Sequence, residues 1–70
     1  MLEKHSISIR GHRTSYSLEK EFYLELKQIA LNRDTPLAKL ITGIDEVRAP
    51  EQNLSSALRL FVLREIKNQN

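Results

Sequence analysis

Hydrophobic and polar positions alternate singly through residues 4–18 and then change to the three-and-four spacing of helices. The alternation runs from His5 to Arg10, is interrupted at Gly11, and resumes up to Leu18, which predicts extended structure. The interruption is compatible with two geometries. Gly11 is either a bulge in one long strand, or part of a turn that folds the two runs into a hairpin. The sequence leaves both alternatives open.

Three amphipathic helices are predicted after the extended region, at about residues 19–32, 35–48 and 53–67. Their apolar positions recur at intervals of three and four residues and form one stripe on each helix. The stripes consist of Phe22, Leu26, Ile29 and Ala30, then Leu37, Leu40, Ile41, Ile44 and Val47, then Leu54, Ala57, Leu58, Phe61, Val62 and Ile66.

Polar and proline-containing segments separate these helices. Thr35 and Pro36 predict the start of the second helix, with Thr35 as its cap and Pro36 in the first helical position. Residues 49–52 form the clearest loop, and Asn53 is expected to cap the third helix.

The second alternating run has two chemically different faces. The face expected to lie inward carries Thr14, Tyr16 and Leu18. The outward face carries Arg13, Ser15 and Ser17, one arginine and two small hydroxyls. In the DNA major groove, arginine can donate two hydrogen bonds to guanine, and serine can bond to the edge of any base. This face is therefore a candidate for contact with DNA bases.

Size and charge both favour a dimer that binds a polyanion. A chain of 70 residues forms one domain with a marginal core, and without cysteine it has no disulfide to compensate, so association of copies is the remaining common remedy. Residues 1–18 hold Lys4, Arg10 and Arg13 against Glu3, and so account for the whole net charge of +2. In a two-fold dimer this excess doubles at one place.

Several other functions find no support. Neither His5 nor His12 belongs to a recognisable catalytic or metal-binding group, and both are expected to be polar residues at the surface or facing a groove. There is no glycine-rich phosphate loop, so we expect neither an enzyme nor a cofactor. No apolar run is long enough to predict a membrane span, and a cytoplasmic, nucleoid-associated location is expected.

Two motifs, together with the order of elements, resemble the ribbon-helix-helix superfamily, and more narrowly a short bacterial branch of it. They are Gly-His-Arg-Thr-Ser-Tyr-Ser-Leu-Glu at residues 11–19 and Asn-Leu-Ser-Ser-Ala-Leu-Arg-Leu-Phe-Val-Leu at residues 53–63, along with the spacing of Phe22, Ile29 and Ala30. The resemblance implies a mainly α fold with a short β-strand (α+β). It also implies an intertwined homodimer with an intersubunit antiparallel β-ribbon, because a single strand needs a partner strand.

The resemblance also implies roles for individual residues. Arg13, Ser15 and Ser17 would contact bases, and residues touching or flanking the phosphates would be Arg10, His12, Thr35, Leu37 and Lys39. The dimer core would hold Thr14, Tyr16, Leu18, Phe22, Leu26, Ile29, Leu40, Ile41, Leu58 and Phe61. The chain departs from the common pattern in two places, the extra run at residues 7–10 and the break around Pro50.

The implied function is sequence-specific binding of double-stranded DNA as a homodimeric transcriptional repressor. The alternative is a dimeric adaptor, similar to an antitoxin, that binds a partner protein through its helices. A hairpin would favour the adaptor, because two hairpins joined in one sheet give four strands, and the major groove comfortably admits a ribbon of two.

Overall fold

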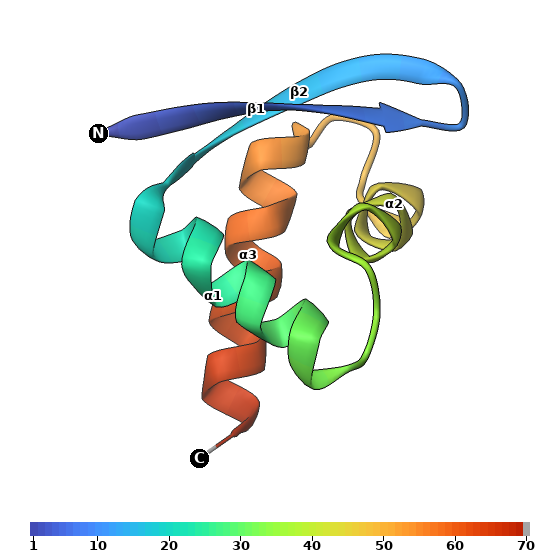
Figure 1. The fold of residues 1–70 in the computed structure, drawn as a ribbon. Helices are drawn as coiled ribbons and strands as arrows, with labels where there is room; N and C mark the ends of the chain where they lie inside the picture. Colours follow the sequence, from blue (N-terminus) through green and yellow to red (C-terminus); the bar gives the residue numbers. More distant parts are fainter. Residues whose placement is uncertain (70) are drawn as a thin grey trace.

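The computed structural model describes residues 1–69, which form a β-hairpin followed by three helices. The elements are β1 (Leu2–Ile9), β2 (His12–Glu19), α1 (Lys20–Asn32), α2 (Leu37–Val47) and α3 (Leu54–Asn68). The three helices lie together on one side of the hairpin, which passes above the N-terminal end of α3 (Figure 1). The predicted α+β class is confirmed, and the helices begin and end within two residues of the predicted ranges.

A tight turn at Arg10 and Gly11 decides between the two geometries that the sequence leaves open. Both residues have positive φ angles, 51° and 80°, the combination that a two-residue type I′ turn requires. Ile9 pairs with His12 beside the turn, and the antiparallel register continues to the pair formed by Leu2 and Glu19. Gly11 is therefore a turn residue, and β2 has a partner strand within its own chain.

The hairpin register places the apolar side chains of both strands on the face that the helices cover. Tyr16 and Leu18 of β2 and Ile9 of β1 are buried, and Ile7 is half-buried. Thr14 lies on the same face as Tyr16, as predicted, but its side chain is exposed. It borders a cleft of about 230 Å³ between the turn end of the hairpin and the C-terminal end of α2, where no helix covers it.

The core joins β2 to all three helices. Its fully buried side chains are Leu18, Leu26, Ile41, Leu58 and Val62. Ile29 and Leu40 are also buried, whereas Phe22 and Phe61 are half-buried at its margin. Two predicted stripe positions are wrong: Val47 is 84% exposed and Ile66 39% exposed. Val47 is the last residue of α2, and Ile66 belongs to the end of α3 farthest from the hairpin.

The capping predictions had opposite outcomes. Asn53 caps α3 as predicted, because its side-chain oxygen accepts from the Ser56 N–H at 2.8 Å. Thr35 does not cap α2, whose N-cap is Pro36. Asp34 has a φ of 53°, and the Thr35 N–H donates to the Ala30 carbonyl, as in a Schellman ending of α1. Thr35 is thus engaged in closing α1, and its hydroxyl donates to the Arg33 carbonyl instead.

We expect Leu18→Ala to lower the free energy of unfolding by about 2–5 kcal/mol, since it leaves a cavity where β2 meets the helices. Chemical denaturation monitored by circular dichroism measures the change. Lys20→Ala is the control, because Lys20 is exposed at the start of α1 and its truncation should cost less than about 0.5 kcal/mol. Equal effects of the two substitutions would contradict the described core.

Candidate nucleic-acid interface

The three residues predicted to contact bases lie together on the face of β2 that points away from the helices. Arg13 and Ser15 are exposed, and Ser17 is half-buried. The alternation that turns Tyr16 and Leu18 into the core turns these three side chains outward. The sequence pattern alone was therefore sufficient to predict their orientation.

β1 adds a second row of side chains to this face, which the sequence analysis missed. Lys4, Ser6 and Ser8 are exposed and pair with Ser17, Ser15 and Arg13, respectively. Directly paired residues point to the same side of a sheet. We call the six residues Lys4, Ser6, Ser8, Arg13, Ser15 and Ser17 the outer face. The alternation of residues 4–9 contained this signal, but it carries information only once the hairpin is known.

The outer face is basic. Its six residues carry two cations and four hydroxyls, and the carboxylate of Glu19, in the next pair on this side, is bound by Arg59. Among residues 1–69, neither Lys4 nor Arg13 has an ion-pair partner. By contrast, Arg10 in the turn binds Glu46 of α2 with 3.0 Å between nitrogen and oxygen. The two unpaired cations remain available to an anionic ligand.

The N-terminal half of α3 fixes the end of β2. The Ser17 N–H donates to the Ser55 hydroxyl at 2.9 Å, and the Arg59 guanidinium donates to the Ser17 carbonyl at 3.4 Å. Arg59 also donates to the Glu19 carboxylate at 2.9 Å, and this hydrogen bond is the main cause of the lowered pKa of Glu19. Both backbone groups of Ser17 are therefore engaged by side chains of α3.

Aromatic stacking fixes β1 against β2 and α1 beneath the outer face. The His5 ring lies parallel to the Tyr23 ring with 3.9 Å between centroids, and it stacks on Tyr16 at 5.4 Å. Burial, and secondarily Tyr23, raises the pKa of Tyr16. The expectation that His5 is a surface or groove-facing residue is wrong, because the register turns it toward the helices. His12 is exposed beside the turn.

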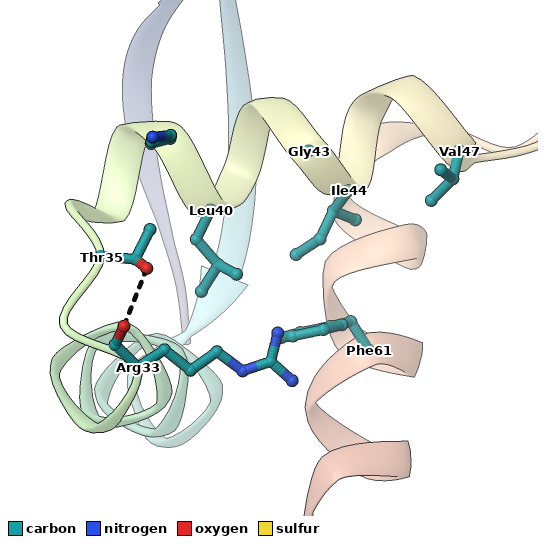
Figure 2. A pocket seen from close by; sticks show the side chains of 8 residues that line it. Arg33, Thr35, Leu40, Gly43, Ile44, Val47 and Phe61 are labelled. Carbon is teal, nitrogen blue, oxygen red and sulfur yellow. Dashed lines mark hydrogen bonds between the residues drawn. The ribbon is translucent and has the colours of Figure 1, made fainter.

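The predicted phosphate-contacting residues of α2 lie elsewhere. Thr35 and Lys39 line a cavity of about 400 Å³ between α2 and α3, where the Arg33 guanidinium stacks 5.3 Å from the centre of the Phe61 ring (Figure 2). Arg33 also binds Glu65 of α3 at 2.6 Å. Leu37 is half-buried against the core. The structure thus brings together the residues predicted to contact bases, but not those of α2 with them.

Comparison with known families agrees with this architecture. The sequence model of the ribbon-helix-helix domain matches residues 2–66, nearly the whole chain, which therefore belongs to the ribbon-helix-helix family. No curated protein and no solved structure gives a significant match. Ribbon-helix-helix domains generally dimerise and bind DNA, so membership supports a role in DNA binding.

None of the helices within residues 1–69 is long and apolar enough to cross a membrane. The same part of the chain holds no cluster of three or more histidine, aspartate or glutamate side chains that could bind a metal ion.

We expect Ser55→Ala to destabilise the protein by about 1 kcal/mol, because it removes the acceptor of the Ser17 N–H. Hydrogen exchange measured by NMR should show faster exchange of the Ser17 amide. Ser56→Ala is the matched control, since among the described residues the Ser56 hydroxyl makes no hydrogen bond. Unchanged exchange of the Ser17 amide in Ser55→Ala would contradict the described contact.

Proposed function

We propose that this chain binds double-stranded DNA in a sequence-specific manner and represses the transcription of nearby genes. The observation that carries the proposal is the exposed Arg13, which has no ion-pair partner among residues 1–69 and shares its side of β2 with the small hydroxyls of Ser15 and Ser17. A guanidinium in the major groove can donate two hydrogen bonds to O6 and N7 of guanine, and Ser15 and Ser17 can bond to neighbouring base edges. Their small size lets the strand approach the bases closely.

The shape of the hairpin supports this assignment. A sheet of two strands has the width that the major groove admits. All three helices lie on the opposite side of the sheet, so the outer face is unobstructed (Figure 1). A single hairpin therefore fits the major groove. The same hairpin is also compatible with the adaptor hypothesis.

Further contacts of the proposed complex would involve phosphates. The first turn of α2, at Leu37 and Lys39, offers unpaired N–H groups and a lysine, a combination that suits a phosphate oxygen. Thr35 precedes that turn, and Arg10 and His12 would reach phosphates from the tip of the hairpin, where both line the cleft against α2. Such contacts position a protein on DNA without specifying sequence.

We also propose that two chains form the DNA-binding unit, which would recognise inverted or tandem half-sites. Six apolar side chains of the helices are at least one-third exposed, namely Leu24, Leu31, Val47, Leu60, Leu63 and Ile66. A second copy that covered some of them would enlarge a core that is small for an independent domain. The predicted core residues Phe22, Phe61 and Thr14 are incompletely buried in one chain, as expected if a second chain contributes to their surroundings.

A second candidate function is a dimeric adaptor that binds another protein. The observed hairpin and the exposed leucines favour it, because those leucines can equally accommodate a partner helix. Joined edge to edge, two hairpins would give a four-stranded sheet too wide for the groove.

Binding to DNA duplexes selected from a random library distinguishes the two functions. For the selected duplex, we expect Arg13→Ala to raise the Kd about 5- to 150-fold, the equivalent of about 1–3 kcal/mol, measured by fluorescence anisotropy. Arg64→Ala is the matched control, since Arg64 is exposed on α3 and has no ion pair among residues 1–69. If no duplex is selected at low salt, or if both variants bind equally well, the DNA-binding proposal fails.

Sedimentation equilibrium tests the proposed dimer. We expect twice the mass of the 8.1 kDa chain at micromolar concentrations, because the small core is stabilised by a second copy. A monomer over the whole concentration range would refute the homodimer.

A further inference from the structure

The two strands of the hairpin carry the same pattern of side chains. Positions 4, 6 and 8 of β1 are lysine, serine and serine, and positions 13, 15 and 17 of β2 are arginine, serine and serine. The intervening side chains also correspond, since Ile7 and Ile9 match the inward Tyr16 and Leu18. The hairpin is thus built from two similar six-residue segments.

The register converts this repeat into a local two-fold symmetry. Ser6 pairs with Ser15 at the centre of the outer face. A two-fold rotation about an axis through this pair exchanges the strands, so that Lys4 takes the place of Arg13 and Ser8 that of Ser17. Each strand therefore begins its part of the outer face with a cation and continues with two hydroxyls.

We propose that the hairpin of a single chain is a complete DNA-reading ribbon, in which Lys4, Ser6 and Ser8 contact bases as Arg13, Ser15 and Ser17 do. This inference rests on the proposed DNA binding and extends its site to β1. The ligand is the major groove of B-form DNA over a short sequence with inverted symmetry. Within each half-site, the six side chains that face the bases come from one chain.

The dimensions of the ribbon agree with one hairpin per groove. Two strands lie about 4.8 Å apart, within a groove about 12 Å wide. Four strands would place the outermost ones about 14 Å apart, which exceeds the groove. On β2, edge-to-edge joining is further limited because α3 already binds both backbone groups of Ser17.

The chemistry of the two cations defines the expected DNA sequence. Lysine, like arginine, donates to O6 and N7 of guanine, and the local two-fold axis directs Lys4 and Arg13 to opposite DNA strands. The two residues are separated by four positions along the ribbon, about 14 Å, which corresponds to roughly four base pairs. We therefore expect a guanine on each strand at about this spacing, related by the symmetry of the site.

The test measures binding of the full-length chain to the duplex selected with the wild-type protein. Lys4→Ala should raise the Kd about 5- to 150-fold, and replacing the guanine opposite Lys4 should weaken the wild type but leave Lys4→Ala unaffected. Lys4→Arg should retain tight binding, and Ser6→Val, which keeps a strand-forming side chain, should weaken it. Lys67→Ala is the control, because Lys67 is exposed near the end of α3 remote from the hairpin (Figure 1).

The outcomes separate this inference from the function on which it rests. If Arg13→Ala weakens binding while Lys4→Ala and Ser6→Val bind like the wild type, only β2 reads the bases and the inference is wrong. Equal losses for Lys4→Ala and Lys67→Ala, with no dependence on the guanine, would show a general charge effect and also overturn it. If the wild type selects no duplex, the proposed function itself fails. Thermal denaturation verifies that each variant is folded.

Discussion

The register of the β-hairpin is the constraint on which the rest of the structure depends. Successive side chains of a strand point to opposite faces, so a shift by one residue would exchange core and surface positions throughout the hairpin. The turn at Arg10 and Gly11 fixes the pairing. Because both residues adopt positive φ angles, the chain reverses within two residues, and Ile9 lies directly opposite His12. That pairing directs Leu18 toward the helices and Arg13 away from them.

The helices support the hairpin in two physically different ways. Leu18 packs among the core side chains of α1, α2 and α3, which anchors β2 by apolar burial. Ser55 and Arg59 of α3 bind the backbone of Ser17 and the carboxylate of Glu19, which anchors the same strand by polar contacts. The third helix, which follows the break around Pro50, thus stabilises the strand that carries Arg13 while leaving the outer face uncovered.

Much of this arrangement could be predicted from the sequence, and what could not has a common cause. Local periodicity indicated the helices and the orientation of Arg13, and the chemistry of Asn53 indicated its cap. Periodicity cannot identify the partner of a strand, so β1 was not assigned to the site. The stacking of His5 on Tyr23 and the engagement of Thr35 in the end of α1 depend on tertiary contacts and on the left-handed Asp34, which propensities do not reveal.

The hydrogen bond between Ser17 and Ser55 has a consequence for the ways in which copies of this chain can associate. The Ser17 N–H, at the edge of the sheet, can donate either to the Ser55 hydroxyl of α3 or to the carbonyl of an added strand. It cannot form a full hydrogen bond with both. Extension of the sheet along the whole of β2 therefore competes with docking of the third helix. The chain must exchange an intramolecular bond for an intermolecular one, which disfavours uncontrolled growth of the sheet at this edge.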